Sequence, residues 1–99
     1  MKDIEIRLTE GDLHPHLRAR MYQRGVTQED IERTLKEGWE ATDTKPVTSG
    51  KLMVFPYEAE WEGQFCQEKE VTVYYKVVGE TITLLTVKAR YDKAFPRRA

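Results

Sequence analysis

The hydrophobic positions of the chain change their spacing near residue 39. Before it they suit helices: Leu17 and Met21 lie four residues apart and mark the buried stripe of a helix that turns by about 100° per residue. After it, apolar residues alternate with polar ones, as they do in strands with one buried face. We therefore predict an α+β fold, in which an N-terminal strand and a two-helix hairpin pack on a mostly antiparallel β-sheet.

The N-terminal strand is expected within residues 1–8. From residue 3 to residue 8, Ile4, Ile6 and Leu8 alternate with charged positions, which is the pattern of a short, half-buried strand. A turn over residues 9–12 then leads into the helices.

The helix hairpin is predicted over residues 13–38 by signals at the helix ends. Pro15 suits a first helical turn, where its missing N–H costs nothing. Gly25 suits the left-handed residue that ends a helix. Thr27, with Asp30 three positions later, forms an approximate capping box for the second helix. These signals predict two short helices joined by a sharp turn.

The antiparallel sheet is predicted over residues 39–91. Its expected strands are residues 39–47, 52–57, 71–78 and 81–91. Pro56 confines its strand to an edge or a bulge, because proline cannot donate to the ladder. Residues 58–69 fit either an acidic loop or a ragged strand pair, and residues 95–99 form a tail.

The turn at Gly79-Glu80 decides which face of the last strand meets the helices. A two-residue turn pairs Val71 with Lys88, and the core face of the sheet then ends in the cations Lys88 and Arg90. A three-residue turn would instead point the side chains of Leu85, Val87 and Ala89 inward. Both registers remain open from the pattern alone.

The length and composition of the chain predict a single domain located in the cytoplasm. Its 99 residues are 39% hydrophobic, which suits a single modest core. No apolar run approaches the roughly 18 residues of a membrane helix, and no signal peptide opens the chain, so we expect no membrane contact. The lone Cys66 excludes an internal disulfide and suits a reducing cytoplasm. The formal net charge of −1 means that any polyanion site must be a local patch.

A cationic cleft between helix and sheet is the candidate site. His16, Arg20 and Arg24 follow one another at four-residue spacing along the edge of the buried stripe. An arginine there must reach solvent, find an anion or line a cleft, since burying an unpaired charge costs several kcal/mol. Lys88 and Arg90 join them if the two-residue turn is correct.

Such a cleft has the parts for metal-independent cleavage of RNA. The RNA supplies its 2′-hydroxyl as nucleophile, and the protein needs a proton shuttle and fixed cations. We expect His16 and Arg20 to be catalytic, and Arg24, Lys88 and Arg90 to bind phosphate. The structural alternatives are carbonyl capping for Arg24, a salt bridge for Arg20, a surface position for His16 and rim packing for Lys88 and Arg90.

Other kinds of site do not fit the sequence. His14 and His16 are too close to share a helical face, and neither Glu-x-x-His nor Cys-x-x-Cys accompanies them, so no metal is expected. The absence of a glycine-rich phosphate loop leaves no expected cofactor. A helix-turn-helix DNA reader is excluded because its second helix would be net acidic.

The first half of the chain resembles a small bacterial family, domain of unknown function 4258. The residues that carry the resemblance are His16-Leu17-Arg18-Ala19-Arg20-Met21, Arg24-Gly25-Val26-Thr27, Asp30-Ile31 and Leu35. That family is similar to the RelE and ParE toxin superfamily, whose fold sets a helix pair against an antiparallel sheet. The resemblance implies a toxin-like domain, with His16, Arg20 and Arg24 as site residues and an antitoxin as its partner.

Two functional hypotheses follow. The first is a toxin-like endoribonuclease with RNA as its substrate. The second is a non-catalytic protein-interaction module on the same fold, which binds a partner through the aromatic and acidic surface of Tyr57, Trp61 and Phe65. A second copy of the chain, in a homodimer, is a further candidate partner.

Overall fold

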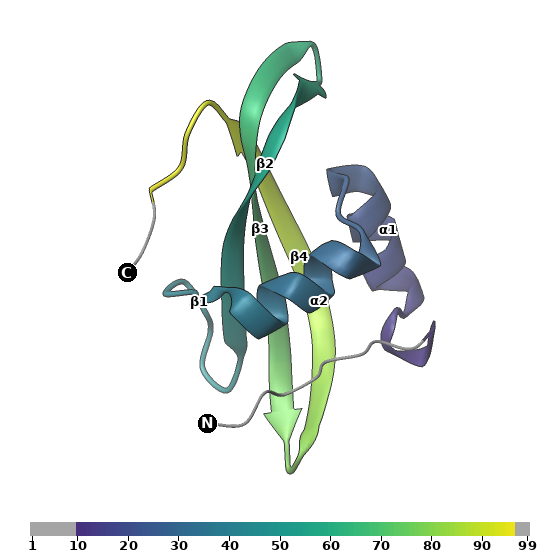
Figure 1. The fold of residues 1–99 in the computed structure, drawn as a ribbon. Helices are drawn as coiled ribbons and strands as arrows, with labels where there is room; N and C mark the ends of the chain where they lie inside the picture. Colours follow the sequence, from purple (N-terminus) through teal and green to yellow (C-terminus); the bar gives the residue numbers. More distant parts are fainter. Residues whose placement is uncertain (1–9, 97–99) are drawn as a thin grey trace.

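A computed structural model describes residues 10–96 of the chain (Figure 1). Its elements are a 3-10 turn η1 (Glu10–Asp12), helices α1 (Pro15–Arg24) and α2 (Gln28–Glu37), and strands β1 (Trp39–Glu40), β2 (Ser49–Trp61), β3 (Gln64–Val78) and β4 (Thr81–Asp92). Two helices and a four-stranded antiparallel sheet make an α+β fold, as predicted. The strand expected over residues 3–8 lies outside the described residues, as do residues 97–99 of the tail.

The helix ends are set by the predicted local signals and by one residue that the prediction did not use. Pro15 is the first residue of α1, and Gly25 ends the helix in the left-handed conformation with φ of 67°. Thr27 and Asp30 form the reciprocal capping box of α2. The N-cap of α1 is His14, whose Nδ1 accepts a hydrogen bond of 3.3 Å from the backbone N–H of Leu17.

The sheet is a meander in the order β1-β2-β3-β4, with every pair antiparallel. Of the two alternatives for residues 58–69, the strand pair is observed: β2 and β3 run to Trp61 and from Gln64, with a turn between them. Pro56 lies at a register shift of this pair, as predicted for a bulge. The strand expected over residues 39–47 is only the two residues of β1.

The register of β3 and β4 agrees with the two-residue turn only near the turn itself. The pairs there are Val77–Ile82 and Tyr75–Leu84, and farther along they are Tyr74–Thr86, Val73–Val87 and Val71–Ala89. Leu85 is the extra residue of a bulge between the two sets. The expected pairing of Val71 with Lys88 is therefore wrong. Because one extra residue reverses the alternation of side chains, Lys88 and Arg90 lie on the opposite face from the one predicted.

Both helices pack on one face of the sheet, with α1 along β4 and α2 across β2 and β3 (Figure 1). The core lies between these layers and contains Leu13, Leu17, Val26, Ile31, Leu35, Phe55, Val71, Val73, Leu84 and Val87. We call the other side the open face. Thr72, Glu70, Lys88 and Arg90 stand there, because they alternate with the buried valines of the core.

Candidate functional site

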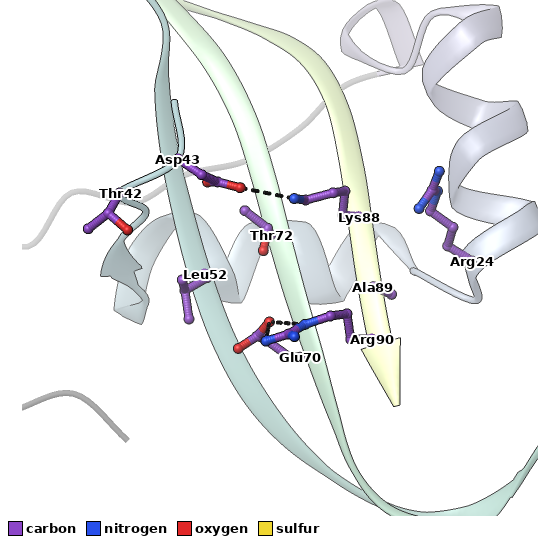
Figure 2. Close-up of a pocket in the computed structure, with 9 residues that line it drawn as sticks. All are labelled: Arg24, Thr42, Asp43, Leu52, Glu70, Thr72, Lys88, Ala89 and Arg90. Atoms are coloured by element: carbon purple, nitrogen blue, oxygen red, sulfur yellow. Dashed lines mark hydrogen bonds and ion pairs between the residues drawn. The ribbon is translucent and has the colours of Figure 1, made fainter. Parts of the chain in front are cut away.

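A depression of about 410 Å³ lies on the open face beside β4 (Figure 2). Its lining includes Arg24, Asp43, Glu70, Thr72, Lys88 and Arg90. The strands supply its floor, the segment between β1 and β2 supplies Asp43, and the last residue of α1 supplies Arg24 from the far side of β4. Three of the five predicted site residues, Arg24, Lys88 and Arg90, thus line one depression.

Two of these three cations are already neutralised by carboxylates. Lys88 Nζ lies 3.0 Å from Asp43 Oδ2, and Arg90 lies 2.9 Å from Glu70 Oε1 through both Nε and a terminal nitrogen. The dashed contacts in Figure 2 mark both pairs. The rim role considered for Lys88 and Arg90 therefore takes the form of ion pairs. Arg90 pairs with Glu70 across β3 and β4, and Lys88 pairs with Asp43 of the segment between β1 and β2.

Arg24 differs from the other two cations because no residue in the described part of the chain pairs with its guanidinium. Its Nε is buried and makes no hydrogen bond, and no described residue forms an ion pair with its side chain. A buried donor that stays unpaired carries a desolvation cost, so the Arg24 side chain is held without the hydrogen bond that would offset its burial. Among the charged residues that line the depression, Arg24 is the one whose charge is available to an anion.

The backbone of Arg24 is fixed by the sheet. Tyr91 Oη donates a hydrogen bond of 2.5 Å to the carbonyl oxygen of Arg24, and Lys69 Nζ donates one of 2.9 Å to the carbonyl oxygen of Gly25. Lys69 also forms an ion pair of 2.9 Å with Asp30. The capping of the last carbonyls of α1, considered for the Arg24 side chain, is thus done by β3 and β4, and this leaves the guanidinium uncommitted.

The turn between the helices rests on an aromatic cluster. Tyr91 stacks on Trp61 at 4.1 Å between ring centroids, and Tyr57 meets Tyr91 edge-on at 4.9 Å. Gly25 sits so close to this cluster that an added Cβ would lie 2.8 Å from Tyr91 Oη. Tyr57 and Trp61 are therefore half-buried structural residues, and only Phe65 of the predicted interaction surface is largely exposed, at 63%.

His16 and Arg20 do not line the depression. His16 is exposed on the first turn of α1, where its ring lies parallel to that of His14 with centroids 6.2 Å apart. Arg20 donates a hydrogen bond of 3.3 Å to Gln23 on the same helix. The structure thus does not bring the predicted proton shuttle together with the cations of the strands.

Asp43 is held as an anion by two donors. Its Oδ2 accepts hydrogen bonds from Lys88 Nζ at 3.0 Å and from Tyr74 Oη at 2.9 Å, and these hold the pKa of Asp43 below its usual value. Hydrogen bonds with Tyr74 and with Asp43 in turn raise the pKa of Lys88. A carboxylate is thus the group that these two donors already bind.

Three residues that matter here were missed by the sequence reasoning. Lys69 has a usable signal, because it alternates with Val71 and Val73 and so falls on the buried face of β3, where a lysine needs a partner. Tyr91 falls on the helix-facing side only once the bulge is counted. Asp43 lies between strands, and nothing in its local sequence indicates that it reaches Lys88.

Within residues 10–96, no group of three or more His, Cys, Asp or Glu residues is arranged to hold a metal ion. In the same part of the chain, no helix is both long and apolar enough to cross a membrane. Comparisons with protein-family models, with curated proteins and with solved structures found no match to this chain.

Proposed function

We propose that the protein is a non-catalytic binding module that holds an anionic side chain of a partner protein on its open face. The observation that carries the proposal is the side chain of Arg24, which lines the depression with a buried, unpaired Nε. Guanidinium groups bind carboxylates with paired, directional hydrogen bonds, so this position suits an acidic residue.

Binding is better supported than catalysis for a geometric reason. Cleavage of a phosphodiester needs a proton shuttle within hydrogen-bond reach of the reacting group. The described residues that line the depression include no histidine, and His16 is exposed on α1. The carboxylates of the lining, Asp43 and Glu70, are each engaged in an ion pair with Lys88 or Arg90, so the arrangement suits holding an anion better than cleaving a bond beside it.

A matched pair of variants tests the proposal. Arg24→Gln removes the free guanidinium but keeps the backbone carbonyl that accepts from Tyr91. Arg20→Gln removes an arginine from the same helix that lies outside the depression. Proteins that co-purify with the wild-type chain should be retained by Arg20→Gln and lost with Arg24→Gln. Equal retention by both variants would contradict the proposal.

The toxin-like endoribonuclease is the second candidate. It is favoured by the presence of three cations, Arg24, Lys88 and Arg90, around one depression, together with the family resemblance of the helix hairpin. Purified protein incubated with total RNA in EDTA tests it against His16→Ala, Arg20→Ala and Arg24→Ala. Cleavage by the wild type that each substitution reduces would favour the enzyme. Equal, negligible cleavage by all four proteins would contradict the endoribonuclease hypothesis.

A further inference from the structure

A second depression of about 370 Å³ adjoins the first on the open face. Its lining includes Asp43, Lys45, Tyr74, Leu85, Thr86 and Lys88, and most of its surface is apolar. Asp43 and Lys88 line both depressions, so their ion pair stands at the boundary between them. The first depression therefore offers the free charge of Arg24, and the second depression, the apolar lobe of the site, offers the apolar surfaces of Tyr74 and Leu85.

The segment over residues 41–48, between β1 and β2, reaches this boundary through Asp43. Among the described residues, the hydrogen bonds of the segment to β3 and β4 are those of Asp43 with Tyr74 and Lys88. Its other hydrogen bonds stay within the segment or reach Gly50 at the start of β2. Both partners of the Asp43–Lys88 pair are about half exposed, with side chains 57% and 48% accessible.

We infer that the two depressions form one site for a peptide segment with a carboxylate next to an apolar side chain, and that Asp43 occupies the carboxylate position until the segment displaces it. The inference rests on the proposed function and names the chemistry of the partner. In the bound state the peptide carboxylate accepts hydrogen bonds from Lys88 Nζ and Tyr74 Oη at the edge of the depression that Arg24 also lines, and the apolar side chain lies against Tyr74 and Leu85.

The charge of the site favours a single carboxylate over a nucleic acid. A phosphodiester chain is held by several cations that are free to replace its counterions. Here Lys88 and Arg90 each face a carboxylate, which leaves Arg24 in the first depression and Lys45 in the second as the lining cations without an ion pair to a described residue. The apolar lobe, moreover, matches a side chain that lies beside the carboxylate, because residues two apart in an extended peptide point to the same side.

Asp43 can be displaced because an exposed ion pair contributes little free energy. Removal of its charge should therefore tighten the binding of a competing carboxylate. Asp43→Asn should lower the dissociation constant up to about fivefold, since an exposed pair is worth at most about that factor. Asp92→Asn is the matched control, because it removes one acid from β4 outside the two depressions.

The experiment is an NMR titration of the full chain with three probes. They are the acetylated and amidated peptide Leu-Ala-Glu, its Leu-Ala-Gln analogue, and uridine 5′-monophosphate. We expect the glutamate peptide to shift the signals of Arg24 and Leu85, to bind Asp43→Asn more tightly than the wild type, and to bind Asp92→Asn like the wild type.

The outcomes separate the inference from the proposed function. Binding of the glutamate peptide to the wild type with no gain in Asp43→Asn, or an equal gain in Asp92→Asn, overturns the inference alone. Equal binding of the glutamine peptide, or tighter binding of the nucleotide, overturns the assigned chemistry of the ligand. If no protein binds any probe, the inference and the proposed function both fail.

Discussion

Lys69 and Tyr91 face each other across β3 and β4 and bind two consecutive carbonyl oxygens of the turn between the helices. Lys69 Nζ donates a hydrogen bond to the carbonyl oxygen of Gly25, and Tyr91 Oη donates one to that of Arg24. One cross-strand pair thus satisfies the end of α1, where a helix leaves carbonyl groups without partners. The pair also fixes where the side chain of Arg24 begins, so the position of the proposed anion site depends on it.

Tyr91→Phe should lower the free energy of unfolding by about 1–2 kcal/mol, because the carbonyl oxygen of Arg24 loses its donor while the ring packing is kept. Urea unfolding followed by circular dichroism measures the change. Tyr57→Phe is the control, since that hydroxyl makes one exposed, long contact of 3.4 Å to Glu60. Equal losses from the two substitutions would contradict the role given to Tyr91.

Stability should fall in alkali, in part because of Tyr91. Burial, followed by the nearby Tyr57 and Asp30, raises the pKa of Tyr91 well above its usual value. Above about pH 10 the unfolded chain releases the phenolic proton while the folded protein keeps it, so stability decreases as pH rises. Urea midpoints between pH 8 and pH 11 should therefore fall more steeply for the wild type than for Tyr91→Phe. Parallel pH profiles would show that Tyr91 does not contribute.

Gly25→Ala should destabilise the protein more than Gly79→Ala does. Both glycines have positive φ, 67° and 62°, so both substitutions carry the left-handed penalty of about 1–2 kcal/mol. Only at Gly25 would the new methyl group meet Tyr91 Oη at 2.8 Å and Trp61 at 3.0 Å; at Gly79 nothing lies within 4 Å. The difference between the two unfolding free energies measures this close approach, and we expect about 1 kcal/mol or more. A difference near zero would mean that the aromatic cluster moves aside for the methyl group at no cost in free energy.

His14→Ala should cost about 1–2 kcal/mol of stability, whereas His16→Ala should change it by less than about 0.5 kcal/mol. His14 caps α1 through Nδ1, and its Nε2 lies 3.0 Å from the carbonyl oxygen of Leu84 on β4. Because Nδ1 accepts from Leu17, Nε2 carries the proton and donates. His16 is exposed, and its contact with another described side chain is the stacking on His14. Thermal unfolding of both variants at pH 7.5 decides the matter, and a larger loss from His16→Ala would reverse the assignment.

The helix hairpin could be predicted because its signals are local. Pro15, Gly25, Thr27 and Asp30 each act on backbone groups within one turn of themselves, so their meaning does not depend on the rest of the fold. The two-residue turn at Gly79-Glu80 could be predicted for the same reason.

The bulge at Leu85 was missed although the pattern marks it. Leu84 and Leu85 are adjacent apolar residues, where the alternation changes phase, and we interpreted that change as a choice between two turn lengths. The register derived from the turn therefore held as far as Leu84 and reversed after it, which placed Lys88 and Arg90 on the wrong face. The final pattern, with Val87 and Ala89 inward, is the one expected for a three-residue turn, although the cause is different.

The candidate site was predicted in part. A helical wheel gives the angle at which His16, Arg20 and Arg24 leave α1, but not the strand over which the helix lies. Because α1 lies along the edge strand β4, only its last residue reaches around to the depression on the open face (Figure 2). Arg24 therefore lines the depression, whereas His16 and Arg20 do not, and the phosphate-binding role of Arg24 stays a prediction.

The bulge also bears on how this chain should be aligned with others. Leu85 is a single residue between two segments of β4 whose pairing is otherwise regular. A relative that lacks one residue at that point would carry its equivalents of Lys88 and Arg90 under the helices and would have no cationic depression on the other side. A one-residue gap in β4 would thus divide sequences that look almost identical into two groups with different binding chemistry.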